Sequence, residues 1–544
     1  MRLKNVLRHE YFPGIVKSAL VFLLALLFRF VHFSQIYKTP LLSTDYVPDT
    51  LPFIIIAEKI IEGNFFYTIP MNMNILYPLY LVPFILLFQK SVIAAVIVQL
   101  IIDSLSAVIV YKIAHRIFGT RSGLLAGVLY SIYGSMIWFA ATPVGESIVI
   151  FFLLLSFLFL IQAVDSKNKT VYYYLSGFLG GVASLGRPNI ILSLVMVTVG
   201  ILFYNYLDKK KYYSVVRYAL GILLVILPFS LNNYYIEKSV SPYPAKGGFN
   251  FYIGNHPGAT GIYVLITGTS NLPYIYMHEA QEVAAKNLGR EVSAKEADIY
   301  WYKQGIGFIV ENPVVALKLL SVKVLLFMNN KELATNLDYD FSSEFSIILK
   351  YSMVPPGILI ALAIMGFITV SNYDCRVVFL KIILSGLVIS TVVFFISDRY
   401  RIVSFPFIII LSAQYIFILN DFIQQRAKTT VIIAVLSSII LIAIAALPLK
   451  IFNIKTENTT AFAHAQYGIY LVNLNRTEEA VPEFQKAIKL NHLDPEPFYY
   501  MSLIYYSKRQ YQSALEYLNK TKTLGGKVDA VYERNLLKSI VGPI

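Results

Sequence analysis

Long apolar runs follow one another through most of the chain, from 16–36 to 430–449. A helix needs about 20 residues to cross the hydrocarbon core of a bilayer, and most of these runs have that length. A spanning segment must pair its own backbone groups, which leaves only helices and closed barrels. Barrel strands alternate in polarity, whereas these runs are continuously apolar. We therefore expect an all-α polytopic membrane bundle with about 11 transmembrane helices.

The composition agrees with a membrane protein. Of the 544 residues, 57% are hydrophobic and 14% are charged, whereas a soluble domain carries about 25% charged residues. The net charge is +14, but much of the Lys and Arg stands in short loops between apolar runs, where it sets the topology. We therefore expect no nucleic-acid partner. The single Cys375 excludes an intrachain disulfide framework.

Charge placement predicts the orientation of the bundle. Four basic residues near the start place the amino terminus inside: Arg2, Lys4, Arg8 and Lys17. The loop at 34–76 then lies outside, as does a longer segment at 236–345. We expect a multi-pass protein of the cell inner (cytoplasmic) membrane. Its catalytic face and its carboxyl-terminal tail would lie on the periplasmic or extracellular side.

The chain divides into a membrane domain, 1–450, and a polar helical tail, 451–544. Positions in the tail recur after 34 residues: Ala480, Phe484 and Ala487 return as Ala514, Leu518 and Thr521, and Gly468 returns as Ser502. This spacing is the tetratricopeptide period, in which small residues let paired helices pack closely. Plain helical hairpins with accidental periodicity are the alternative.

Three carboxylates stand near the expected outer boundary. Asp49 heads a helical pattern that continues through Phe53 and Ala57, and Asp45 precedes it. A carboxylate at a helix start is stabilised by the helix dipole, so both residues are explained equally well as caps. Glu146 stands at the outer end of a span. An acid that faces a membrane bundle is a functional candidate, and a solvated helix start is the alternative.

Three arginines stand on the side that the positive-inside rule disfavours: Arg187, Arg399 and Arg401. Either they anchor the chain at the interface by snorkelling, or they bind an anion. We favour an anion from lipid or substrate, because the arginines converge on the same leaflet as the carboxylates.

The outer segment holds a glycine-rich stretch, Gly-Gly-Phe-Asn-Phe-Tyr-Ile-Gly-Asn at 247–255, preceded by Lys246. Glycines let the backbone approach a ligand or turn tightly. Asn250, Asn255 and His256 offer hydrogen bonds that suit a sugar or a phosphate, and an ordinary structured loop is the alternative. No Walker loop, zinc spacing or nucleophile elbow appears in the sequence, which disfavours nucleotide-driven transport and serine-type hydrolysis.

Together these segments resemble the GT-C membrane glycosyltransferases, specifically the protein O-mannosyltransferase and aminoarabinose-transferase-like family (glycosyltransferase family 39-like). The segments that carry the resemblance are 49–63, 76–80, 116–119, 123–126, 146–147, 185–188, 247–255 and 399–401. They span nearly all of the membrane part in a shared order. The tail is not part of the family core.

The resemblance implies a GT-C fold that transfers a sugar from a polyprenyl-phosphate donor to an acceptor protein or glycan at the outer face. It makes Asp49 the essential acid, Glu146 a second catalytic acid and Arg187 a basic residue near the carrier phosphate. Some relatives have a metal-binding Glu just before the proline of the first-loop motif. Here Leu76 and Tyr77 stand in that region, so a divalent cation (Mg, Mn or Zn) stays open.

From chemistry, one carboxylate would take the acceptor proton and arginines would stabilise the departing phosphate. We expect Asp49 to be the base and Asp45, Arg187, Lys246, Asn255, His256, Arg399 and Arg401 to bind substrate. Membrane lipid and a protein bound by the repeat tail are the other expected partners. Two alternatives are a transporter or flippase, and a membrane scaffold that acts through the tail.

Overall fold

The computed structural model describes residues 2–42, 47, 49–63, 73–88, 92–165, 169–207, 212–266, 269, 276–335, 338–352, 354–454 and 457–541. Over these residues the chain forms helices, and its one β-type pairing is an isolated bridge between Ile262 and Ile396. The all-α fold class expected from the apolar runs is confirmed.

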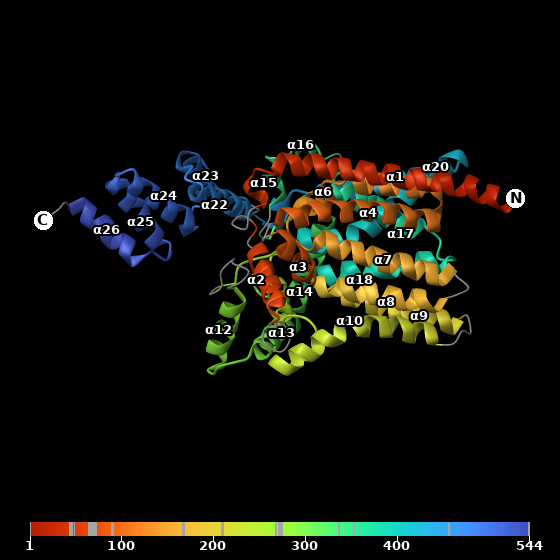
Figure 1. Cartoon of the computed structure of the whole chain (residues 1–544), viewed down its shortest axis with the longest axis horizontal. Coiled ribbons are helices and arrows are strands. Elements are labelled where there is room, and N and C mark those ends of the chain that lie inside the picture. Colours follow the sequence, from red (N-terminus) through yellow and green to blue (C-terminus); the bar gives the residue numbers. More distant parts are fainter. Residues whose placement is uncertain are drawn as a thin grey trace.

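Seven of the described helices are long and apolar enough to cross a membrane, and a bent pair is an eighth candidate (Figure 1). The seven are α1 (Arg2–Ile36, apolar from Gly14), α4 (Val92–Phe118), α7 (Glu146–Asp165), α10 (Tyr213–Glu237), α18 (Cys375–Val392), the run α19 (Asp398–Arg401), η2 (Ile402–Ser404) and α20 (Phe405–Gln424), and α21 (Lys428–Ala445). The bent pair is α5 (Thr120–Ile132) and α6 (Gly134–Ala141), which meet at 55°.

Three shorter or less apolar helices pack into the same bundle: α8 (Lys169–Gly186), α9 (Ile190–Leu207) and α17 (Pro356–Thr369). α8 lies against α7 and α10, α9 against α18, and α17 against α20. Glycines permit the close α8–α10 crossing, since a Cβ on Gly177 would lie 2.0 Å from the carbonyl oxygen of Tyr218. Length and composition alone therefore give fewer spans than expected, but the eight candidates and these three helices correspond to the eleven apolar runs.

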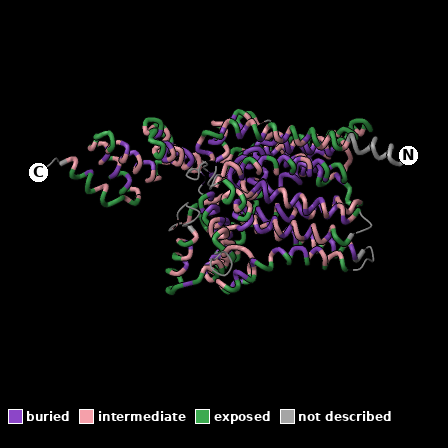
Figure 2. Tube along the Cα trace, in the orientation of Figure 1, coloured by how far each residue is buried: buried purple, intermediate pink, exposed green. Residues whose placement is uncertain are grey.

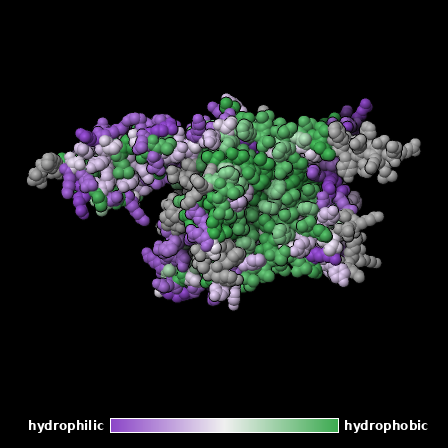
Figure 3. Space-filling model, viewed as in Figure 1, coloured by the Kyte–Doolittle hydropathy of each residue, from purple (hydrophilic) through white to green (hydrophobic). Residues whose placement is uncertain are grey.

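The surface of the bundle is suited to lipid. Figure 3 shows an apolar face over the bundle, with hydrophilic atoms toward its two ends, and Figure 2 shows the buried positions concentrated in its interior. On α1, Leu20, Leu23 and Leu27 are 61%, 59% and 58% exposed. Apolar side chains so exposed fit a hydrocarbon environment, because lipid tails are as apolar as leucine.

The remaining helices of the membrane domain are short. They are η1 (Pro40–Leu42), α2 (Thr50–Ile61), α3 (Leu76–Phe88), α11 (Gly247–Gly254), α12 (Tyr276–Leu288), α13 (Ala294–Glu311), α14 (Pro313–Met328), α15 (Tyr339–Ser343), α16 (Ile347–Lys350) and η3 (Leu449–Phe452). In Figure 1, α2, α12, α13 and α15 lie at the end of the bundle opposite the amino terminus. The expected outer loops thus gather at one end.

The tail contains α22 (Glu457–Asn473), α23 (Thr477–Leu490), α24 (Pro495–Ser507), α25 (Tyr511–Thr523) and α26 (Ala530–Val541). α22 pairs with α23, and α24 pairs with α25. A Cβ on Gly468 would lie 2.6 Å from the Phe484 ring, and Ser502, one period later, donates a 2.7 Å hydrogen bond to Ala514 O. This geometry agrees with a 34-residue repeat. The tetratricopeptide assignment and the boundary after residue 450 remain predictions.

A buried ion pair joins three helices inside the bundle. Arg29 Nε on α1 lies 2.5 Å from Asp103 Oδ2 on α4, and both side chains are fully buried. The Tyr130 hydroxyl on α5 donates to Asp103 Oδ1 at 2.8 Å. Removing one partner of such a pair leaves a buried charge uncompensated.

We expect Asp103→Leu to destabilise the protein by about 3 kcal/mol or more, because Arg29 keeps its charge in an apolar interior. The double variant Arg29→Met with Asp103→Leu should recover most of that loss. Thermal unfolding of the purified protein in detergent measures both effects. Equal melting temperatures for the single and double variants would show that the pair does not carry this stability.

Candidate active site

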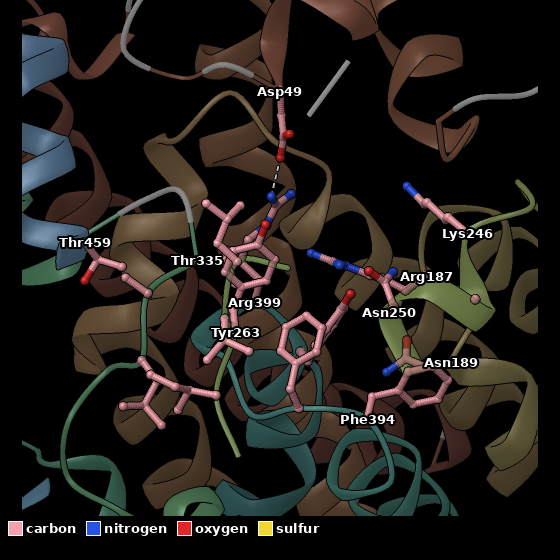
Figure 4. A pocket seen from close by; sticks show the side chains of 18 of the residues that line it. Asp49, Arg187, Asn189, Lys246, Asn250, Tyr263, Thr335, Phe394, Arg399 and Thr459 are labelled. Atoms are coloured by element: carbon pink, nitrogen blue, oxygen red, sulfur yellow. Dashed lines mark hydrogen bonds and ion pairs between the residues drawn. The ribbon is translucent and has the colours of Figure 1, made fainter. Parts of the chain in front are cut away.

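Asp49 stands at the start of α2, as the sequence pattern indicates, but it does not cap the helix. Its side chain makes no capping hydrogen bond. The neighbouring Thr50 hydroxyl donates to Pro143 O at 3.2 Å, while Phe53 and Ala57 are buried against the bundle. The Asp49 carboxylate instead forms an ion pair with Arg399 (Figure 4). Of the two explanations open from the sequence, the structure therefore disfavours the cap.

Arg399 lies on the short helix α19, whose start is fixed by Ser397. The Ser397 hydroxyl accepts a hydrogen bond from Tyr400 N at 3.3 Å. Arg401, two residues beyond Arg399, is fully buried and donates to Asn329 O at 2.7 Å and to Glu332 Oε2 at 2.7 Å. Arg401 thus anchors the segment, whereas Arg399 reaches the acids.

Glu146 begins α7 and joins two arginines. Its Oε1 lies 2.6 Å from Arg399 Nε and also forms an ion pair with Arg187, which follows the end of α8. The Arg187 guanidinium lies over the Tyr400 ring, 5.3 Å from its centroid. Asp49, Arg399, Glu146 and Arg187 therefore form a continuous chain of alternating charge, assembled from four separate parts of the sequence.

A cavity of about 820 Å³ opens beside this chain. Asp49, Arg187, Lys246, Asn250 and Arg399 line it (Figure 4). Glu146 is 1% exposed and is not among the lining residues. The two carboxylates therefore differ in access, since only Asp49 borders the space where a ligand would lie.

Lys246 adds a third cationic group to the cavity. Burial lowers its pKa to about 8; Asp49 opposes this shift, and Arg187 and Arg399 add to it. Asn250 lies one turn further along, with its backbone N–H bonded to Lys246 O at 3.1 Å. Asn250, which the sequence offered for its hydrogen-bonding amide, therefore lines the same cavity as Lys246.

Three residues expected to bind substrate do not line the cavity: Arg401, Asn255 and His256. Asn255 is buried, and its amide donates to Phe251 O at 2.8 Å and to Val393 O at 3.0 Å. Its Oδ1 accepts a hydrogen bond from the buried Lys323 at 3.0 Å. His256 Nδ1 accepts from Gly258 N at 3.1 Å. Neither Asn255 nor His256 lines the cavity, and Asp45 falls outside the described residues.

The described acids do not form a donor set that suits a divalent cation. No group of three or more His, Cys, Asp or Glu side chains comes together in the part of the chain that the structure describes. Asp49 and Glu146 are both paired with Arg399, and a cation between them would have to displace that guanidinium. We therefore assign no chemical step to a metal.

Comparison with known proteins gives one family match. Residues 75–235 match the family model of dolichyl-phosphate-mannose-protein mannosyltransferase. The matched part includes α3, α4, Glu146 and Arg187, but it is less than half of the chain. The expected resemblance to the GT-C membrane glycosyltransferases is confirmed over these residues, and it supports a membrane glycosyltransferase. No curated protein matches the chain.

Solved structures of an oligosaccharyltransferase from Archaeoglobus fulgidus show a distant likeness. The apo form is 14% identical with a TM-score of 0.41, and the match covers 83% of this chain and 56% of that one. A complex with an inhibitory peptide and a dolichol-phosphate is 12% identical, with a TM-score of 0.41 and 84% and 56% covered. A complex with Zn and sulfate is 13% identical, with a TM-score of 0.38 and 78% and 53% covered. This chain thus spans a little over half the length of those proteins.

The two acids should respond differently to substitution. Glu146→Ala leaves Arg187 and Arg399 buried without that shared partner, so we expect a loss of about 3 kcal/mol or more. Asp49→Asn keeps the shape of a side chain that borders the cavity, and we expect a smaller loss. Melting temperatures in detergent compare the two variants. An Asp49→Asn protein that is less stable than Glu146→Ala would contradict this division.

Proposed function

We propose that the protein transfers a sugar from a polyprenyl-phosphate donor to an acceptor hydroxyl at the outer face of the cytoplasmic membrane. The observation that most supports this proposal is that Asp49 lines the same cavity as Arg187, Lys246 and Arg399. A carboxylate beside several cations offers both a base for the acceptor and a binding place for a phosphate. This arrangement and the mannosyltransferase-family match favour an enzyme over a transporter, a flippase or a scaffold.

The charge of the site matches that donor. Asp49 and Glu146 carry two negative charges, and Arg187, Arg399 and protonated Lys246 carry three positive charges. The cluster therefore has one excess positive charge, and a polyprenyl-phosphate sugar is a phosphodiester with one negative charge. Binding the donor would neutralise the site.

The reaction breaks the bond between the anomeric carbon and the phosphate oxygen, whose electron pair stays on the phosphate. The acceptor oxygen forms the new bond to the anomeric carbon, and Asp49 takes its proton. Negative charge thus moves from Asp49 to the phosphate as the reaction proceeds. The cationic side chains lie where that charge grows, which stabilises the transition state more than the ground state.

The Asp49–Arg399 ion pair suggests how the base is released. In the free protein the Arg399 guanidinium contacts both Asp49 and Glu146. A bound phosphate competes with Asp49 for this guanidinium, while Glu146 keeps it in place. The carboxylate then becomes available to the acceptor only when the donor is present.

The cavity also has an apolar side. Ile191 and Leu192 from α9, and Val393 and Phe394 after α18, line it. Both helices belong to the bundle, and we place the prenyl chain of the donor against these apolar side chains. The activity named by the matched family makes mannose the sugar and dolichyl phosphate the carrier to test first.

We expect Asp49→Asn to lower kcat by about 10² to 10⁴-fold, the usual contribution of a general base. The KM for the donor should change much less, because the cationic groups remain. Transfer of labelled mannose from dolichyl phosphate mannose, with melting temperature as the folding control, measures this. A folded Asn variant with full activity would refute the role of Asp49.

Donor binding should depend on the charge of Lys246. Below its pKa of about 8 the side chain is protonated and attracts the phosphate, and above it the charge is lost. The kcat/KM for the donor should therefore fall between about pH 7 and pH 9, since the pH dependence of kcat/KM reports the free enzyme. Lys246→Arg keeps its charge in this range, so its kcat/KM should stay flat. A fall in kcat/KM that persists in Lys246→Arg would assign the ionisation to another group.

A further inference from the structure

The carboxyl-terminal tail forms one wall of the reaction cavity. Asn453 and Ile454, Thr459 and Phe462 of α22, and Asn491 and Asp494 from the turn between α23 and α24 all line it. In Figure 4, Thr459 lies across the cavity from Lys246. These residues are separated from Asp49 by about four hundred positions in the sequence, yet they face the same space.

The wall is held in place by the other face of α22. The Thr460 hydroxyl donates to Asp338 Oδ2 at 2.7 Å. The Phe341 ring of α15 contacts His464 at 5.0 Å and Tyr467 at 5.9 Å between ring centroids. Residues 460, 464 and 467 follow one face of the helix, while 459 and 462 follow the cavity face. The tail is therefore docked onto the membrane domain by contacts that leave its cavity face open.

The two sides of the cavity differ in charge. Arg187, Lys246 and Arg399 stand on the side that suits the phosphate. The tail side offers two amides, a hydroxyl, a phenyl ring and one carboxylate, Asp494, whose side chain also accepts a hydrogen bond from Glu496 N at 3.0 Å. Among the lining residues that the structure describes on this side, none is cationic. A second anion would be repelled by the Asp494 carboxylate there, so this side disfavours an anionic acceptor.

We propose that the tail wall binds the acceptor, and that the acceptor is a neutral saccharide whose hydroxyl is presented to Asp49. This inference rests on the proposed function. Sugar hydroxyls both donate and accept hydrogen bonds, as do the amides and the hydroxyl of the wall. An extended peptide is commonly held through its backbone at a strand edge, and the described wall consists of helices and turns without such an edge.

The test separates the acceptor from the donor in the full-length protein. Thr459→Trp fills the tail side of the cavity, and Asn519→Trp places the same ring on an exposed site of α25 as a matched control. Phe462→Ala is a second variant that removes an apolar contact without adding bulk. Hydrolysis of dolichyl phosphate mannose by water reports the donor side. Mannose transfer to a neutral p-nitrophenyl disaccharide, its phosphorylated form or a neutral threonine peptide reports the acceptor side.

We expect Thr459→Trp and Phe462→Ala to raise the KM for the neutral disaccharide at least tenfold, with donor hydrolysis within twofold of the unmodified protein. Asn519→Trp should change neither reaction. The inference is overturned if Thr459→Trp and Phe462→Ala leave the acceptor KM unchanged, or if hydrolysis falls equally with transfer. It is also overturned if only the peptide or the phosphorylated sugar accepts mannose. An unmodified protein that neither hydrolyses nor transfers the donor refutes the proposed function itself.

Discussion

The structure depends on a chain of alternating charges at one end of a helical bundle. Asp49, Arg399, Glu146 and Arg187 come from four distant segments and meet with little exposure to solvent. Desolvating such groups can cost more than a single pair returns, so the two buried arginines are stable there only while Glu146, the partner that they share, is present. The helices α2, α7, α8 and α19 must therefore reach one point for the bundle to close there. Asp49, Arg187 and Arg399, which bring these helix ends together, also line the cavity, so the same residues serve the fold and the site.

The groups around this chain divide into those that hold it and those that face the cavity. Arg401 binds backbone carbonyls and Glu332 and thereby fixes the turn that carries Arg399. Lys323 and Asn255 both bond to Val393 O, which ties α14 and α11 to the end of α18. The Lys323 ammonium, the Asn255 amide and the terminal nitrogens of Arg401 are hydrogen-bonded inside the protein, as buried polar groups usually are. Residue type alone does not separate the two classes, because an arginine or an asparagine serves equally well as a clamp or as a ligand.

Much of this could be predicted from the sequence, and the failures have physical causes. The apolar runs predicted the helical bundle because a helix needs a known number of residues to cross the hydrocarbon core. The outward arginines stood out because they oppose the charge rule, and two of the three line the cavity. Asn255 and His256 were predicted to bind substrate because their side chains can form hydrogen bonds. The Asn255 side chain is buried, however, and donates its hydrogen bond to the backbone. The tail wall could not be predicted from the sequence, because no local pattern links Thr459 or Asn491 to Asp49. The packing of α22 against α15 brings them to the same cavity.

Access rather than acidity decides which carboxylate can act as the base. Glu146 presents one oxygen to two guanidinium groups and is 1% exposed, so a proton placed there would break both ion pairs and lie away from the cavity. Asp49 forms an ion pair with Arg399. It also borders the cavity. Protonating Asp49 leaves Arg399 still paired with Glu146, and the charge that Asp49 gives up is replaced by the charge growing on the phosphate. The network can therefore pass through the reaction without leaving a buried cation unpaired, which it could not do if the two acids exchanged roles.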